Sequence, residues 1–225
     1  MPALDVVIPT LDAAATLSRT LSVVRQANPA TITVCDGGSR DDTAAIAAAN
    51  GATVLVTAPG RGGQLAAGSE AGNAPWVLFL HADTVPGEGW VEALDRFTSE
   101  PLNATKAGYF RLRLDSSDTR ARRIERLARW RCNTFGLPYG DQGLLIARRF
   151  YRLLGGFGSL PLMEDVDLVR RVGRRNLVPL DACAITSVAR YERDGWLARP
   201  TRNLSCLALY FAGVPPHRIA RLYHR

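Results

Sequence analysis

The sequence has few of the features that mark a disulfide-bonded, a zinc-binding or a membrane-spanning protein. Its four cysteines lie far apart and form no Cys-x-x-Cys pair, which argues against a thiolate zinc site and a disulfide scaffold. The longest apolar segment, residues 204–214, is too short to cross a bilayer. Residues 4–8 read as a strand, with no charged and then apolar leader before them. We therefore expect a protein of the reducing cytoplasm.

Lysine is almost absent, because Lys106 is the only lysine among the 28 basic residues. Arginine therefore supplies the net charge of +7, and its planar fork suits phosphates, carboxylates and anionic membrane surfaces. Nucleic acid is the less favoured partner, since the arginines are not interleaved with aromatic residues and no nucleic-acid module is recognisable. The composition thus indicates small anionic ligands or a membrane surface, and no nucleic acid.

The pattern of apolar runs predicts an α/β fold. Short apolar runs alternate with helical stretches, in the order strand, helix, strand, helix, strand, at residues 5–8, 13–26, 31–35, 41–49 and 53–57. Such alternation predicts a Rossmann-like, mostly parallel sheet flanked by helices. Further strands are expected at 76–80, 107–114 and 144–147, and further helices at 89–97, at 118–131 and from 164. We place one domain at residues 1–195 and a basic amphipathic helical segment at 196–225, broken at two prolines.

Three acidic clusters stand where sheet strands are expected to end. They occupy residues 35–39, 81–84 and 164–167, and the first two directly follow apolar strands. In an open α/β sheet the ligand crevice lies outside the carboxyl ends of the strands. The sequence therefore predicts that these acids converge on one pocket.

The chemistry of the clusters suggests roles for their acids. Asp83 is a candidate ligand for Mg²⁺ or Mn²⁺, with His81 as a second ligand or an orienting group, although a lone acid there can simply form a turn. Glu164 and Asp165 can cap a helix, an effect of about 0.3–1 kcal/mol. If Asp165 faces the pocket, it can instead take a proton from an attacking hydroxyl.

Two other segments have both a functional and a purely structural interpretation. The glycine-rich residues 59–68, with Arg61, can form a phosphate cradle, or only a flexible loop before a helix. The helix at 118–131 is crowded with arginines, part of which form a solvated face. We expect Ile124, Leu127 and either Trp130 or Arg131 on its buried side.

Residues 7–12 and 35–43 resemble the nucleotide-contacting segments of family 2 glycosyltransferases, which have the GT-A fold. The resemblance implies that Asp83 ends a DXD-like metal motif and that Asp165 is the base of a Glu-Asp motif with Glu164. Asp12 departs from the family's usual Asn or Glu. The expected contacts to the donor are Pro9, Thr10, Asp12, Asp36, Arg61, Gln64, His81, Asp141 and Gln142.

Five segments also resemble a narrower subgroup, the arsenosugar-biosynthesis or radical-SAM/selenodomain-associated glycosyltransferases. They are residues 60–64, 79–84, 139–143, 163–167 and 218–223. In this subgroup His replaces the first Asp of the DXD motif, as His81 does here.

The function that we expect is inverting sugar transfer from a nucleotide-diphosphate sugar, with UDP favoured, assisted by Mg²⁺ or Mn²⁺. The acceptor is a hydroxyl on an unknown small or lipid-linked molecule. Three alternatives stay open: a polyprenyl-phosphate sugar synthase, a nucleotidyltransferase, and a membrane-surface scaffold with a relic nucleotide site. The basic C-terminal segment is a candidate for peripheral contact with the inner membrane face.

Overall fold

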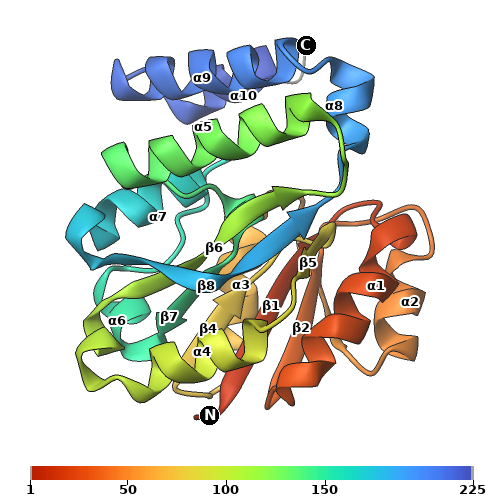
Figure 1. Ribbon diagram of the computed structural model, residues 1–225. Helices are drawn as coiled ribbons and strands as arrows, with labels where there is room; N and C mark the ends of the chain where they lie inside the picture. The colour runs from red at the N-terminus through yellow and green to blue at the C-terminus, as the bar shows by residue number, and fades with distance from the viewer. Residues whose placement is uncertain (1, 224–225) are drawn as a thin grey trace.

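One mixed sheet forms the centre of the computed structural model, which describes residues 2–223 except for the side chain of Arg190. Eight strands of this described part are ordered β3-β2-β1-β4-β7-β6-β8-β5 across the sheet (Figure 1). Their bounds are β1 Leu4–Thr10, β2 Thr31–Asp36, β3 Thr53–Val56, β4 Trp76–Phe79, β5 Thr84–Pro86, β6 Ala107–Leu114, β7 Leu144–Ala147 and β8 Leu177–Thr186.

The first half of the sheet is parallel and deeply buried. Strand β1 pairs in parallel with β2 and β4, and β2 pairs in parallel with β3. Every residue of β1 is buried, as expected for an apolar strand covered on both faces. In the second half, β7 runs antiparallel between β4 and β6, and β5 runs antiparallel to β8. The predicted α/β fold with a mostly parallel sheet is confirmed.

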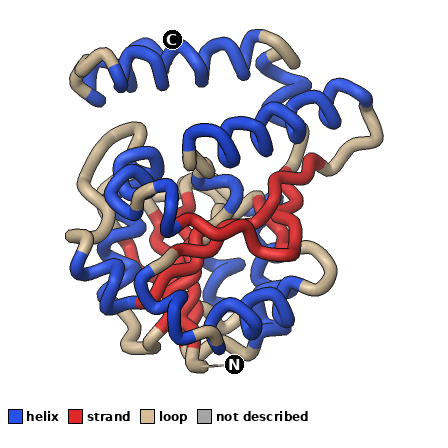
Figure 2. Tube along the Cα trace, turned by 60° about the vertical axis from the view of Figure 1, so that its left-hand side comes forward, coloured by secondary structure: helices blue, strands red, loops and turns tan. Residues whose placement is uncertain are grey.

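Helices cover the sheet and extend beyond its upper edge. Their bounds are α1 Ala14–Val24, α2 Thr43–Ala49, α3 Arg61–Glu70, α4 Trp90–Ser99, α5 Thr119–Phe135, α6 Arg148–Leu153, α7 Glu164–Val172, α8 Ala189–Asp194, α9 Ala198–Phe211 and α10 Pro216–Tyr223. In Figure 1, β1 runs upward from the N-terminus, and α5, α9 and α10 lie above the edge where it ends. Figure 2 shows the same layer of helices, with the C-terminus at the top, from another side.

The buried face of α5 differs from the prediction. Its buried residues are Ala121, Glu125, Ala128 and Cys132, whereas Leu127 and Trp130 are more than half exposed. The small side chains let the helix lie close to β6, and Glu125 accepts a 2.8 Å hydrogen bond from the Leu114 amide at the end of that strand. The expectation was therefore wrong for Leu127 and, of the two alternatives, for Trp130, whereas Ile124 and Arg131 are partly buried.

A buried ion pair fixes the opposite edge of the sheet. Asp5 in β1 lies 2.6 Å from Arg148, the first residue of α6, and both side chains are buried. Asp5 also accepts hydrogen bonds from the Thr31 hydroxyl at 2.7 Å and the Ala74 amide at 2.8 Å. These contacts satisfy the buried Asp5 carboxylate with hydrogen bonds, and they join β1, β2 and α6 at the start of the strands.

The C-terminal helices belong to the main core. Cys206 and Leu207 of α9 and Ile219 of α10 are buried in the same apolar cluster as β1. Helix α9 ends before the two prolines at 215 and 216, as predicted, and α10 begins at Pro216. Within residues 2–223, no helix has both the length and the apolar composition to span a membrane. The domain division at residue 195 stays a prediction, and residues 224–225 of its second segment lie outside the described residues.

Candidate active site

The first group of predicted site residues lies where β1 and β2 end. The Asp36 carboxylate accepts hydrogen bonds from the Thr10 hydroxyl at 3.0 Å, from the Ser39 amide at 2.9 Å and from the Ser39 hydroxyl. Burial raises the pKa of Asp36, but these hydrogen bonds outweigh it and leave the pKa below its ordinary value. Asp36 is therefore a fixed, ionised anchor of the turn after β2.

Two more predicted residues stabilise the same strand ends. Asp12 has a positive φ of 50° and accepts a 2.8 Å hydrogen bond from the Arg40 amide, which joins the loops after β1 and β2. Gln64 is buried, and its side-chain amide donates to the carbonyls of Thr10 at 2.8 Å and Cys35 at 2.7 Å. Pro9 is a buried residue of β1. The predicted nucleoside contacts of this group remain predictions.

The second group gathers around Arg61, the first residue of α3. Its guanidinium donates through Nε to Glu164, lies 3.7 Å from Asp165 and approaches the His81 ring at 3.5 Å. Glu164 is fully buried, and burial raises its pKa while Arg61 opposes that rise. Helix α3 thus connects the two groups, because Arg61 lies in one and Gln64, one turn later, lies in the other.

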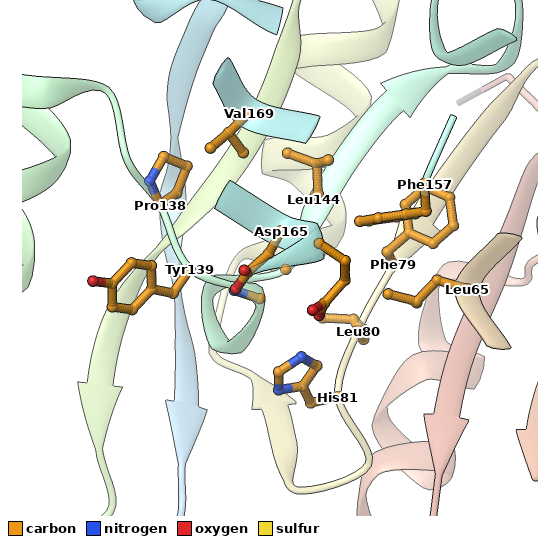
Figure 3. Close-up of a pocket in the computed structure, with 13 residues that line it drawn as sticks. Leu65, Phe79, Leu80, His81, Pro138, Tyr139, Leu144, Phe157, Asp165 and Val169 are labelled. Atoms are coloured by element: carbon orange, nitrogen blue, oxygen red, sulfur yellow. The ribbon is translucent and has the colours of Figure 1, made fainter. Parts of the chain in front are cut away.

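Asp165 points into the pocket from the first turn of α7. Its carboxylate accepts 2.8 Å hydrogen bonds from the Gly140 amide and from the Val166 amide. In Figure 3, Asp165 and His81 extend into one pocket from different elements, with Tyr139 beside them. A Cβ on Gly140 would lie 2.5 Å from the His81 ring, so only glycine lets the loop approach this closely.

Asp141 adds a further carboxylate to this group. Burial raises its pKa, Arg131 opposes that rise, and the charges of Asp165 and Asp83 add to it. Its Oδ1 is buried and has no hydrogen-bond partner within the described structure. A buried carboxylate oxygen without a donor is costly and indicates that a ligand or cation completes the site.

Gln142 has a supporting position and contacts Arg131, which the sequence offered with Trp130 as a candidate for the buried side of α5. Its side chain donates to the Phe110 carbonyl at 3.0 Å and accepts from Arg131 at 2.9 Å. Arg131 also lies 3.4 Å from the centre of the Tyr139 ring. Together they fix the loop that carries Gly140 and Asp141. Helical periodicity could place Arg131 on the buried side of α5, but it could not indicate its contact with Gln142.

The acidic residues of this site fit a hard divalent cation whose other ligands would come mainly from the phosphates of a substrate. The described residues contain no group of three or more His, Cys, Asp or Glu side chains arranged to hold a metal. Magnesium and manganese need only one or two protein carboxylates when substrate phosphates supply the other ligands. Asp83 and Asp141, whose Oδ1 has no partner within the described structure, are the candidate carboxylates for such a cation.

A second cavity lies between α5, α7 and α9, and we call it the α5–α9 groove. It has a volume of about 580 Å³ and is mainly apolar, with Leu137, Val169, Leu204 and Phe211 in its lining. Val169 also lines the pocket of Asp165. The groove therefore adjoins the candidate active site.

Acidic side chains at the carboxyl edge of a mostly parallel sheet are typical of an α/β protein that binds a nucleotide or another phosphate ligand. The model of glycosyl transferase family 2 matches residues 5–150 of the chain. The chain therefore belongs to glycosyl transferase family 2, a family of glycosyltransferases. No curated protein matches it in sequence.

Solved structures show the same architecture. Glucosyl-3-phosphoglycerate synthase from Mycobacterium tuberculosis, in complex with Mn²⁺, UDP and glucosyl-3-phosphoglycerate, has a TM-score of 0.61 at 20% identity over 95% of this chain and 81% of that chain. S. aureus TarS 1–349 has a TM-score of 0.62 at 14% identity, over 84% of this chain and 62% of that one.

A structure described as a mycobacterial protein has a TM-score of 0.57 at 23% identity; the match covers 83% of this chain and 65% of that chain. At such identities these likenesses show the fold alone, and they confirm the predicted GT-A architecture.

Proposed function

We propose that this protein is an inverting glycosyltransferase that moves a sugar from a nucleotide-diphosphate sugar, with UDP favoured, to an acceptor hydroxyl. The observation that carries this proposal is the convergence of Arg61, His81 and Asp165 at the carboxyl edge of the sheet. The family membership supports the same reaction class.

Asp165 is the proposed base. Two amides orient its carboxylate toward the pocket, so that it can accept the proton of the acceptor hydroxyl as that oxygen attacks the anomeric carbon. Attack on the face opposite the leaving group inverts the configuration at that carbon. Arg61 is placed to stabilise negative charge on the departing diphosphate.

The donor site would use both groups of residues. Asp36 and Thr10 form the fixed turn proposed for nucleoside contact, and Asp83 with Asp141 would hold Mg²⁺ or Mn²⁺. When bound, the cation would supply positive charge to the leaving diphosphate. Structures of the M. tuberculosis synthase contain UDP with Mg²⁺ or Mn²⁺, which supports the same donor class here.

For the acceptor we propose a chemical class, not a particular molecule. The resemblance to the arsenosugar-associated subgroup favours a small soluble acceptor, in a cytoplasmic enzyme. The alternative, a polyprenyl-phosphate acceptor at the inner membrane face, is supported by the α5–α9 groove beside the pocket. The exposed Trp130 and Phe211 near its helices would suit peripheral membrane contact.

Substitution of the base tests the proposal. We expect Asp165→Asn to lower the rate of UDP release from a UDP-sugar by about 100-fold or more, while UDP affinity changes little. Asp167→Asn is the matched control, because Asp167 lies in the same helix turn but pairs with Arg171 at 2.5 Å. Wild-type turnover in Asp165→Asn would refute the base assignment.

The products of the reaction distinguish a glycosyltransferase from the alternative functions. Release of nucleoside diphosphate identifies sugar transfer or donor hydrolysis, whereas release of inorganic diphosphate from a nucleoside triphosphate would identify a nucleotidyltransferase. Vesicle binding without either product would favour the membrane-surface scaffold.

A further inference from the structure

A cluster of arginines surrounds Asp194 at the end of α8, and we call it the Asp194 cluster. Arg193 lies 2.8 Å from one carboxylate oxygen, and Arg199 at 3.0 Å and Arg202 at 2.9 Å share the other. The Arg193 hydrogen bond, followed by those of Arg202 and Arg199, holds the pKa of Asp194 well below its usual range. Among the described side chains of this cluster, three guanidinium groups face one carboxylate, an excess of two positive charges.

One donor of this cluster has no acceptor. The Nε atom of Arg202 is buried and makes no hydrogen bond within the described structure, and Arg199 is also largely buried. A charged donor that is buried without an acceptor costs more than a neutral one. Arg202 Nε and Asp141 Oδ1 are the only two such side-chain atoms among the described residues. The Asp194 cluster is therefore built to receive a further anion.

The helices of the Asp194 cluster follow the end of β8, whose last residue, Thr186, donates a 3.5 Å hydrogen bond to the Asp141 carbonyl of the candidate site. Arg199 lies 5.4 Å from the centre of the Tyr191 ring, and burial, followed by the charge of Asp141, raises the pKa of Tyr191 to about 12. Arg202 lies 4.9 Å from the centre of the Tyr223 ring. Figure 1 shows α8, α9 and α10 along the edge where β1 ends.

We infer that Arg199 and Arg202 bind a phosphate monoester group on the acceptor. This inference rests on the proposed function and specifies its acceptor class. A phosphate monoester has a charge of about −1.5 to −2 at neutral pH, which matches the excess of positive charge in the cluster, and its oxygens suit guanidinium forks. The bound phosphate would accept a hydrogen bond from Arg202 Nε, while the acceptor hydroxyl extends toward Asp165.

Calorimetry on the full chain, saturated with UDP and Mn²⁺, tests the inference with two probes. One probe is sn-glycerol 3-phosphate, and the other is phosphatidylcholine vesicles that contain phosphatidic acid, so the source of the phosphate is resolved. We expect saturable binding of at least one probe, weakened about tenfold by Arg202→Ala. Arg202→Lys should weaken it similarly, since lysine keeps the charge but lacks the Nε donor.

Arg96→Ala is the matched control, because Arg96 pairs at 3.5 Å with Asp181 on an exposed surface, and its loss lowers the net charge equally. Absence of saturable binding of both probes, or equal binding by the Arg202→Ala and Arg96→Ala variants, would overturn the inference. Probe binding to the protein without UDP that is lost when UDP is present would also overturn it, since the cluster would then belong to the donor site. UDP binding itself is measured in each variant, so a failure of the proposed function is recognised separately.

Discussion

Arg61 and Glu164 form an ion pair that joins the first residue of α3 to the first residue of α7. Glu164 is fully buried and Arg61 is about two-thirds buried. A buried carboxylate that loses its partner is strongly destabilising, whereas a neutral side chain of the same shape is not. This pair therefore fixes the two helix ends between which Asp165 is positioned.

We expect Arg61→Ala to lower the free energy of unfolding by about 2–4 kcal/mol, a value reduced from the fully buried case because Arg61 is partly exposed. The double variant Arg61→Ala/Glu164→Gln should recover at least half of that loss, since no buried charge remains unpaired. Chemical denaturation of the wild type, both single variants and the double variant measures the coupling. If the double variant were no more stable than Arg61→Ala, an unpaired Glu164 carboxylate would not be the cause of the lost stability.

The same pair predicts a pH dependence with a defined sign. Burial raises the pKa of Glu164 in the folded protein, and removal of Arg61 should raise it further. The folded state then binds a proton that the unfolded state releases, so stability falls as pH rises from the unfolded pKa to the folded one. The stability difference between Arg61→Ala and wild type should therefore shrink as pH falls from 8 to 5. A difference that grows on acidification would contradict this account.

The Asp5–Arg148 ion pair should affect stability without affecting the site. Both side chains are almost completely buried, so Asp5→Ala leaves an unpaired guanidinium and should cost about 3–5 kcal/mol. The exposed Asp181 offers a control, because loss of its 3.5 Å contact with Arg96 should cost less than about 1 kcal/mol. UDP affinity of the folded Asp5→Ala protein should equal that of the wild type. A large loss of affinity would show that the two edges of the sheet are coupled.

Exposed apolar residues of α5 and α9 provide the test of membrane contact. We expect the double variant Trp130→Ser/Phe211→Ser to reduce sedimentation with vesicles that contain phosphatidylglycerol, because both side chains are more than half exposed. Leu153→Ser is the control, since Leu153 is even more exposed than Trp130 and Phe211 but lies on α6, away from these helices (Figure 1). Point variants are preferable to truncation, because α9 and α10 contribute core residues. Unchanged sedimentation would remove these residues from the proposed contact.

The parallel half of the sheet could be predicted because its strands are short, continuous apolar runs. Strand β8 was missed because Pro179 and Asp181 interrupt its apolar residues. The sequence also gave no expectation for the short β5, α6 and α8. Such elements are defined by their tertiary partners, and a local pattern is too weak to reveal them.

The sequence singles out the acids that follow apolar strands, as with Asp36 and Asp83, and their roles in the candidate site stay predictions. The contact between Arg61 and Glu164 joins residues 103 positions apart, so no local spacing could indicate it. Arg131 was offered only as an alternative to Trp130 for the buried side of its helix, because helical periodicity alone does not show that it contacts Gln142. The fold brings both pairs to the same site, where the loop of Gly140 and the first turn of α7 meet.

Calorimetric titration of UDP in the presence and absence of Mn²⁺, on wild type and Asp83→Ala, tests the central claim most directly. The account predicts UDP binding that depends on Mn²⁺ and is abolished or strongly weakened by Asp83→Ala, with a normal thermal unfolding transition in the variant. No UDP binding to the folded wild type under either condition would contradict the assignment of a nucleotide-sugar donor site.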